Sequence, residues 1–347
     1  MIGTPNATWQ AGAVRSTASD APLLTVGIDV GGTKTACVVT DENDRVLLHE
    51  VVATDPARLT VQLSALARRA VDRFATQPSE GTVAAVGVAL PGRVEPQSGA
   101  ASLAVNLGAA DLDVGRELEQ SVGLPCYVEH DARAAATWVH ARSAAAAADD
   151  DLVYLSVGTG IAAGIVLQGH ILRGASGLAG EVGHSFADPN GPRCACGMKG
   201  CLEVVAAGPA VARMTREALA AGRQSNLSAD SGAADVFSAA TAGDELAIEI
   251  TTSVAEHLAR AIRGLVLTLG VRHVVIGGGV AASGEALLGP LLAAIGRERA
   301  ASPLVEAAFA QASIELLSPK IEAGARGAAA IARRRVNAQQ REGVGDR

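Results

Sequence analysis

Short apolar runs separated by turn residues open the patterned part of the chain. The run LLTVGIDV ends at Gly-Gly-Thr, TACVVTD follows it, and RVLLHEVV begins after an Asp-Glu-Asn-Asp turn. Apolar runs bounded by glycine or acidic turns are typical of buried strands joined in hairpins. The pattern predicts three successive antiparallel strands within residues 23–52.

Helical spacing follows these strands. Residues 56–75 begin with a proline and carry apolar side chains three and four positions apart, which predicts an amphipathic helix. The next elements expected are a strand at 83–92, a helix at 114–123, a strand at 125–131 and a helix at 132–144. Alternation of this kind indicates an α/β unit.

The same order then returns with little sequence identity. Residues 151–174 contain a strand, a Gly-Thr-Gly turn, a second strand and a short third strand. Further on, we expect a long helix at 245–270, a buried strand with a glycine turn at 273–281 and a terminal helix at 322–336. We interpret the two halves as a duplicated α/β unit.

Composition supports a globular α/β protein. The chain has 347 residues, of which 49% are apolar and 2% aromatic. Its length favours two domains, and so few aromatic residues argue against a carbohydrate module built on aromatic platforms. Lys and Arg number 29 against 36 Asp and Glu, a net charge of −7, so nucleic acid is not an expected partner.

Neither a signal peptide nor a membrane span is expected. Residues 1–23 have no apolar core and are expected to form a disordered tail. No stretch of eighteen apolar residues runs without a break, so a membrane partner is not expected either. Five cysteines in a chain of this length do not suggest an exported disulfide scaffold, and a cytoplasmic location is expected.

The first glycine hairpin stands between two predicted strands, so it fits neither a P-loop nor a dinucleotide fingerprint, each of which opens a helix. Its glycines let backbone N–H groups approach an anion, and the hydroxyl of Thr33 and the ammonium of Lys34 add donors. Asp29 is placed to hold a hydrated Mg²⁺. The candidate phosphate-binding residues here are Asp29, Gly31, Gly32, Thr33 and Lys34.

Two later glycine turns are weaker candidates. The second hairpin offers the same backbone amides without a carboxylate, and its residues are Gly158, Thr159 and Gly160. One such hairpin is commonly only a tight turn, but two in duplicated halves favour a phosphate clamp. The third run follows the strand HVVI and consists of Gly277, Gly278 and Gly279; a sharp strand-to-helix turn and a nucleotide contact both remain open for it.

Three of the five cysteines lie within eight residues. Together with a preceding histidine they supply three thiolates and one imidazole, a set that completes a tetrahedral structural zinc site with no open position. The ligands expected are His184, Cys194, Cys196 and Cys201. A disulfide between Cys194 and Cys196 would be strained and would leave Cys201 odd. Cys37 and Cys126, each alone in a strand, are expected to be small core residues.

The ordered set IDVGGTK, SVGTG and VVIGGG, with the cysteine loop CACGMKGCLE, resembles the ROK branch of the actin-like sugar kinase superfamily. The resemblance covers about residues 24–335. It implies a duplicated actin-like (ribonuclease H-like) α/β fold with two lobes, a cleft between them and a structural zinc loop. The lobes expected are 24–135, completed by a C-terminal helix at about 321–336, and 136–320, which contains the zinc loop 184–203; a loose tail is expected at 337–347.

The resemblance also implies the sugar-binding residues. Glu181 and Glu203 would hold sugar hydroxyls, and His184 would bind zinc through one ring nitrogen and face the sugar with the other. Asn106 matches the family's Asn-Leu stretch and would meet a sugar hydroxyl. Arg93 stands where N-acetylmannosamine kinases of the family look similar, with an arginine near the acetyl group; a solvated arginine in a turn is the plain alternative.

Asp131 is the expected catalytic base. It ends the strand CYVEH and begins a helix, where a carboxylate is delivered to take a hydroxyl proton; an N-cap role is the alternative. ROK kinases typically read Glu-Asn-Asp-Ala-Asn here, and the asparagine before the aspartate binds sugar. This chain has His130 in that place, which makes His130 a candidate sugar ligand, and Arg133 in place of the second asparagine, so the identity of the sugar stays open.

The resemblance implies an ATP-dependent kinase that phosphorylates a hexose at its 6-hydroxyl, with ATP, Mg²⁺ and a structural Zn²⁺. Glucose is the expected acceptor, and N-acetylmannosamine or another N-acetylhexosamine is the alternative. A sugar-responsive ROK regulator would carry an N-terminal helix-turn-helix domain, for which too few residues precede the first strand. A sugar-binding protein without turnover would be expected to lack the base or the first hairpin. ROK proteins are usually dimers or tetramers, so a homo-oligomer is expected.

Overall fold

The computed structural model describes residues 22–95, 100–102, 113–143 and 151–345. The chain divides into two compact units: unit 1 comprises Met1–Asp149 and Glu322–Arg347, and unit 2 comprises Asp150–Ile321. The boundary expected at residue 135 falls inside helix α3 (Asp131–Arg142). That whole helix packs against α11 (Ala323–Gly345) of the same unit, so the division comes later in the chain than the sequence indicates.

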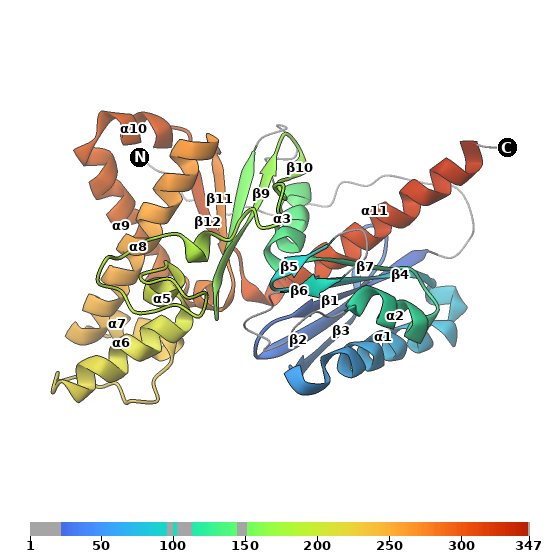
Figure 1. Ribbon diagram of the computed structural model, residues 1–347, viewed down its shortest axis with the longest axis horizontal. Coiled ribbons are helices and arrows are strands. Elements are labelled where there is room, and N and C mark those ends of the chain that lie inside the picture. The colour runs from blue at the N-terminus through green and yellow to red at the C-terminus, as the bar shows by residue number, and fades with distance from the viewer. Residues whose placement is uncertain (1–21, 96–99, 103–112, 144–150, 346–347) are drawn as a thin grey trace. The chain divides into compact units, whose positions relative to one another are not determined.

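Unit 1 is built on a five-stranded sheet in the order β3-β2-β1-β4-β7 (Figure 1). The strands β1 and β2 are antiparallel, as are β2 and β3, whereas β4 and β7 continue the sheet in parallel with β1. This arrangement confirms the three antiparallel strands predicted first. The strand bounds are Leu23–Val30 for β1, Lys34–Thr40 for β2, Val46–Ala53 for β3, Thr82–Leu90 for β4 and Cys126–His130 for β7. The short strands β5 (Arg93–Val94) and β6 (Ala101–Ser102) pair separately.

Helices cover both faces of this sheet. On one face, α1 (Leu59–Ala75) and α2 (Val114–Val122) bury an aliphatic core against the strands. On the other face, α11 and α3 pack against small strand residues (Figure 1). An added Cβ at Gly27 or at Gly87 would overlap a backbone carbonyl of α11, so only glycine lets the helix lie this close. The helix continues to Gly345, past residue 337 where the loose tail was expected to begin.

Unit 2 repeats the sheet of unit 1. Its order is β10-β9-β8-β11-β12, with β8, β9 and β10 antiparallel and β11 and β12 parallel to β8. The same order and strand directions in both units confirm the predicted duplication. The strand bounds are Leu152–Val157 for β8, Ile161–Leu167 for β9, His170–Ile171 for β10, His273–Gly277 for β11 and Ser313–Leu316 for β12.

A helical layer packs on this second sheet. The long helix α8 (Glu245–Leu269) begins where the Asp244 side chain accepts the Ala247 N–H and ends at Gly270, which has a φ of 71°. One apolar stripe of α8, including Leu258 and Ile262, is fully buried in the core of unit 2. The other helices are α5 (Glu203–Ala206), α6 (Gly208–Ala220), α7 (Ala233–Thr241), α9 (Glu285–Ala301) and α10 (Pro303–Phe309).

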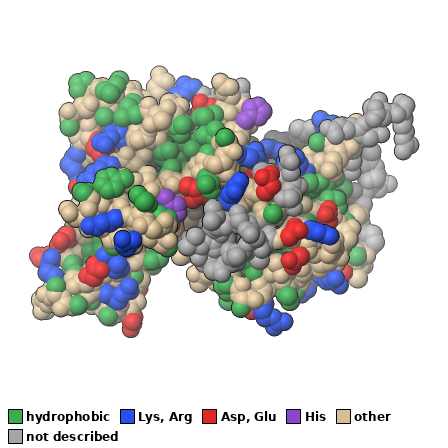
Figure 2. Space-filling view, viewed as in Figure 1, with side chains coloured by type: hydrophobic (Ala, Val, Ile, Leu, Met, Phe, Trp, Pro, Cys, Tyr) green, Lys and Arg blue, Asp and Glu red, His purple; other side chains and the backbone are tan. Residues whose placement is uncertain are grey.

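The surface agrees with the mixed charge of the sequence. On the face seen in Figure 2, the described acidic and basic side chains are interspersed with apolar ones. Among the described residues, no helix combines the length and the apolar character needed to cross a membrane.

Candidate functional site

The first glycine turn joins β1 to β2 and is held by hydrogen bonds from the end of β3. Gly31 donates its N–H to the Lys34 carbonyl at 2.9 Å, and the Thr54 hydroxyl donates to the Gly31 carbonyl at 2.7 Å. The Thr54 N–H donates to the Thr33 carbonyl at 3.0 Å. Gly32 and Thr33 remain exposed at the tip, so a fixed turn presents its outer backbone to solvent.

Asp29, at the end of β1, lies against the first turn of α11. An added Cβ at Gly324 would overlap the Asp29 carboxylate, so a glycine at that position makes room for the acid. The pKa of Asp29 is raised to about 7, mainly by burial and also by the negative charges of Asp131 and Glu322, while Lys34 opposes the shift. Three carboxylates therefore act on one another in unit 1, an excess of negative charge that suits a divalent cation.

Lys34 forms an ion pair that the sequence did not predict. Its Nζ lies 3.0 Å from Glu322 Oε1, and His49 Nε2 lies 3.8 Å from the same oxygen. Glu322 is the first residue of unit 1 after the chain returns from unit 2, and it has a φ of 53°. Its side chain is 11% exposed, whereas that of Lys34 is 55% exposed. A ligand at the turn would compete with Glu322 for the lysine.

Asp131 is the first residue of α3, at the junction with β7. Its Oδ1 accepts the Ala132 N–H at 2.6 Å and lies 3.2 Å from His130 Nδ1. The side chain of Asp131 is 32% exposed, but that of His130 is 5% exposed. Behind this junction, Arg133 Nε donates to Glu129 Oε1 at 2.8 Å, with both side chains at most 3% exposed. The sequence motif thus folds into one partly exposed acid backed by three buried polar side chains.

The second glycine turn joins β8 to β9 in unit 2. Ser156 occupies the next-to-last strand position that Asp29 occupies in unit 1. Gly158 donates its N–H to the Gly160 carbonyl at 2.9 Å, and its own carbonyl accepts the Gly208 N–H at 2.8 Å. An added Cβ on Gly158 would lie 3.5 Å from the amide nitrogen of Gly279. The second and third glycine runs therefore meet in unit 2.

The third glycine run needs a glycine at position 278 for packing. Gly278 has a φ of 85°, and a Cβ there would lie 2.5 Å from the carbonyl oxygen of Val157. Gly279 begins a short 3₁₀ helix, Gly279–Ser283, after β11. The sharp strand-to-helix turn and the proximity to the second hairpin are both present, so the two interpretations of this run are compatible.

Four side chains gather in the cysteine loop as a metal site requires. The ligand atoms of His184, Cys194, Cys196 and Cys201 all lie within 4.8 Å of one another. Cys194 Sγ is 3.6 Å from His184 Nδ1, and Cys196 Sγ is 3.6 Å from Cys201 Sγ. A tetrahedral zinc with its usual bond lengths separates two sulfur ligands by about 3.8 Å. Burial raises the pKa of Cys201 to about 12, so this thiol needs a cation to become a thiolate.

The cysteine loop is tied to the second hairpin through Glu203. Glu203, the first residue of α5, accepts the Ile161 N–H at 3.2 Å through Oε2, and Ile161 directly follows Gly160. On the other side of the loop, an added Cβ at Gly183 would overlap the Ile161 carbonyl. His184 ends a 3₁₀ turn, Val182–His184, that begins after Glu181. The candidate sugar ligands of unit 2 are thus anchored to the start of β9.

Two predicted sugar ligands stand apart from these clusters. Arg93 is exposed in the short strand β5. Asn106 lies outside the described residues. Unit 1 brings Asp29, Lys34 and Asp131 together, and unit 2 brings the metal ligands, Glu203 and the two glycine runs together.

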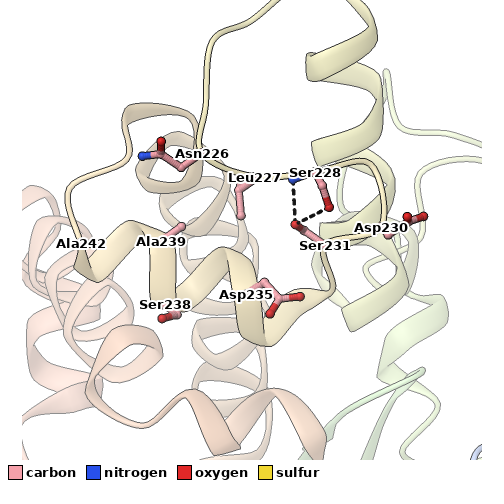
Figure 3. A pocket seen from close by; sticks show the side chains of 9 residues that line it. All are labelled: Asn226, Leu227, Ser228, Asp230, Ser231, Asp235, Ser238, Ala239 and Ala242. Carbon is pink, nitrogen blue, oxygen red and sulfur yellow. Dashed lines mark hydrogen bonds between the residues drawn. The ribbon is translucent and has the colours of Figure 1, made fainter.

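A separate pocket of about 500 Å³ lies in unit 2 between residues 226–231 and α7 (Figure 3). Some of its polar groups are engaged locally: the Ser228 N–H donates to Ser231 Oγ at 3.0 Å, and Asp235 Oδ2 of α7 accepts the Gly232 N–H at 2.8 Å. The pocket wall includes none of the residues predicted for the site. We therefore give it no part in the site. It is lined by Asn226, Leu227, Ser228, Asp230, Ser231, Asp235, Ser238, Ala239 and Ala242.

The chain is similar to proteins of one family along most of its length. The profile of the ROK family matches residues 25–335. The glucokinase of Thermotoga maritima is 32% identical over 326 residues, which are 90% of this chain and 98% of that protein. The N-acetylmannosamine kinase of Citrobacter koseri is 33% identical over 262 residues, 74% of this chain and 84% of that protein.

A solved structure supports the same relationship. The crystal structure of a ROK family glucokinase from Streptomyces griseus, in complex with glucose and AMPPNP, matches with a TM-score of 0.74 at 30% identity. The match covers 90% of this chain and 99% of that chain. Together with the repeated sheet, it confirms the duplicated α/β fold that the sequence resemblance implies.

Proposed function

The chain belongs to the ROK family, and from this we propose that it is an ATP-dependent kinase that phosphorylates a hexose at the 6-hydroxyl. The observation that carries the proposal is the acidic group of unit 1, in which the partly exposed Asp131 acts electrostatically on Asp29 beside the first glycine turn. Phosphoryl transfer needs such a combination: a carboxylate to accept the hydroxyl proton and a place for a cation and phosphate oxygens.

In unit 1, Asp131 takes the proton of the acceptor hydroxyl. The exposed backbone of Gly32 and Thr33 faces the transferred phosphate, and Lys34 exchanges Glu322 for a phosphate oxygen. Asp29 is the residue that would hold Mg²⁺. Of the charged groups that act on its carboxylate, Asp131 and Glu322 are negative and Lys34 is positive, so the surroundings are net negative and favour a cation. Mg²⁺ supplies neutralisation of the charge on the terminal phosphates.

In unit 2, the glycine turns contact the nucleotide and the cysteine loop holds the sugar. The nucleotide ligands proposed are Gly158, Thr159, Gly160, Gly277, Gly278 and Gly279. Glu181, His184 and Glu203 bind sugar hydroxyls, and a structural zinc fixes the loop that carries them. With these four protein ligands, a bound zinc would have no open coordination position and would stabilise the loop without taking a chemical part in the transfer.

Glucose is the acceptor we favour, because a glucokinase matches nearly the full chain. An N-acetylmannosamine or other N-acetylhexosamine kinase is the second candidate, supported by the relative of that activity and by Arg93, whose guanidinium can donate to an amide carbonyl. We further propose a cytoplasmic homo-oligomer whose partners are the sugar and the nucleotide.

A coupled ADP-release assay tests this function. Purified protein is given ATP, Mg²⁺ and, separately, glucose, mannose, fructose, N-acetylglucosamine and N-acetylmannosamine. At least one sugar is expected to raise ADP release well above the rate with ATP alone, and the preferred sugar decides between the two candidates. If none does so, the proposed activity is wrong.

Two variants make this assay specific for the base. Asp131→Asn should lower kcat by about 10²- to 10⁴-fold while sugar binding persists, because a carboxamide cannot accept the hydroxyl proton. Asp72→Asn, an exposed carboxylate of α1, is the matched control and should keep the parent rate. Equal rates for the parent and Asp131→Asn would exclude Asp131 as the base.

A further inference from the structure

The contacts of Asp131 concern one of its two carboxylate oxygens. Oδ1 accepts the Ala132 N–H at 2.6 Å and lies 3.2 Å from His130 Nδ1. The imidazole is therefore a close polar neighbour of that oxygen, although the two atoms do not have the angle of a hydrogen bond. The Ala132 N–H and the buried imidazole both lie on the Oδ1 side, which restricts the side-chain torsions of Asp131 and distinguishes Oδ1 from Oδ2.

His130 is itself held in place by a buried ion pair. Glu129 Oε1 accepts the backbone N–H of His130 at 2.9 Å and the Nε–H of Arg133 at 2.8 Å. The side chains of Glu129 and Arg133 are 3% and 2% exposed. A buried ion pair commonly adds little net stability, because desolvating two charges offsets their attraction. The position of this ion pair beside a candidate base therefore fits a role in holding nearby side chains better than a role in stability.

The burial of His130 argues against direct contact with a substrate. The imidazole is 5% exposed and lies beside the carboxylate, whereas Asp131 next to it is 32% exposed. A side chain that binds a sugar hydroxyl must present a polar atom where the sugar can reach it. His130 presents Nδ1 to Asp131 instead.

We propose that His130 is a positioning residue, which together with the Glu129–Arg133 pair holds Asp131 so that Oδ2 is the reacting oxygen. This inference rests on the proposed kinase function. Oδ2 accepts the proton of the 6-hydroxyl while the sugar oxygen forms its bond to the γ-phosphorus. The bond from that phosphorus to the bridging oxygen breaks, and ADP leaves with the electron pair.

The test compares kcat with KM in variants of His130. His130→Phe keeps a ring of similar size without a donor and should lower kcat by about 10- to 100-fold, with the KM and Kd of the sugar within about threefold, because a misplaced base slows the chemical step alone. His130→Asn places an amide nitrogen near the position of Nδ1 and should restore most of kcat. His140→Phe, in the helix α3 that follows His130, is the matched control and should match the parent.

The opposite division of effects would overturn the inference. If His130 binds the sugar, His130→Phe raises KM and Kd by tenfold or more with little change in kcat. An unchanged kcat and KM would also overturn it. Failure of the parent protein to release ADP with any sugar would instead refute the proposed function, so the two failures are distinguishable.

A second variant keeps the test valid if His130→Phe does not fold. Arg133→Met removes the buried guanidinium and should lower kcat with the sugar Kd unchanged, measured after its melting temperature and metal content are shown to match the parent. The double variant with His130→Phe should be no slower than the slower single variant, since both act through Asp131. Independent, multiplying effects would contradict a shared positioning role.

Discussion

The two units share a sheet but differ at the turn that each sheet presents. In unit 1 the turn after β1 is surrounded by charge: Asp29 precedes it, Lys34 follows it, and Glu322 pairs with the lysine. In unit 2 the turn after β8 is surrounded by backbone: Ser156 precedes it, and Gly208 and Gly279 lie against it. A duplicated scaffold has therefore produced one turn with charged side chains beside it and one that lies against backbone, and the proposed function gives them different tasks.

What packs beside each turn accounts for this difference. The first turn of α11 brings Glu322 and Gly324 to Asp29 in unit 1. In unit 2 the cysteine loop reaches β9 through Glu203. The place of the turn in the sheet is common to both units, whereas the chemistry comes from segments distant in sequence. Substitutions in each of these segments test whether it accounts for the difference between the two turns.

The largest effect is expected at the cysteine loop. Cys201→Ser replaces a buried ligand and should abolish metal binding and lower the melting temperature by about 10 °C or more, since a structural metal contributes several kcal/mol to folding. Metal analysis and calorimetry check this. Cys126→Ser, in unit 1, is the control and should retain the metal. Full metal content in Cys201→Ser would contradict the assigned ligand set.

Next in size is the effect of crowding Asp29. Gly324→Ala would overlap the Asp29 carboxylate and should destabilise the protein by about 1–3 kcal/mol. Gly296→Ala in α9 meets no atom within 4 Å and should stabilise it by about 0.5–1 kcal/mol, the usual helix-propensity gain. Urea unfolding of both variants measures the difference, and equal stabilities would show that the overlap is relieved without cost.

A pH dependence should follow from Asp29. Its pKa is about 7 in the folded protein and near 4 when unfolded, so the folded state binds more protons between these values. Stability is then greatest at the acid end of this interval and falls by at most about 1.4 kcal/mol per pH unit as pH rises through 7. Urea unfolding at several pH values should show a shallower fall in Asp29→Asn than in the parent. Parallel curves would disprove the shift.

The smallest effect is expected at the ion pair of Lys34. Glu322→Gln frees the lysine for phosphate and removes a nearby negative charge, which should lower the KM for ATP by about two- to fivefold, as expected for a partly exposed pair. Initial-rate kinetics check it. Glu306→Gln breaks the exposed pair with Arg299 in unit 2 and serves as the control. A raised KM in Glu322→Gln would mean that the carboxylate assists binding.

Patterns within short stretches of the sequence predicted most features that depend on residues close together in the chain. The hairpins, the repeated order of strands and the four metal ligands all follow from spacing within a few tens of residues, and the structure brings the four ligand side chains together. The contact of Lys34 with Glu322 joins residues 288 positions apart, and no sequence pattern marks it. The fit of Gly324 against Asp29 likewise depends on how α11 lies on the sheet.

Buried charge was the other source of missed structure. Arg133 looks like a surface residue in the sequence, yet it is 1% exposed. Asp44 lies in a polar turn, yet its Oδ2 accepts the Trp138 Nε1–H at 2.8 Å and lies 2.9 Å from Arg326 Nη1. Hydrophobic periodicity treats every charged residue as exposed, so paired charges inside a unit cannot be recognised from it.

The central claim is that the two matching turns have different tasks, and one kinetic comparison tests it most directly. Asp29→Asn and Ser156→Ala alter equivalent strand positions of unit 1 and unit 2, and kcat is measured for both with the preferred sugar. The account predicts a loss of about 10²-fold or more for Asp29→Asn and a change of less than about threefold for Ser156→Ala. Similar losses in both variants, or a parent-like rate in Asp29→Asn, would contradict it.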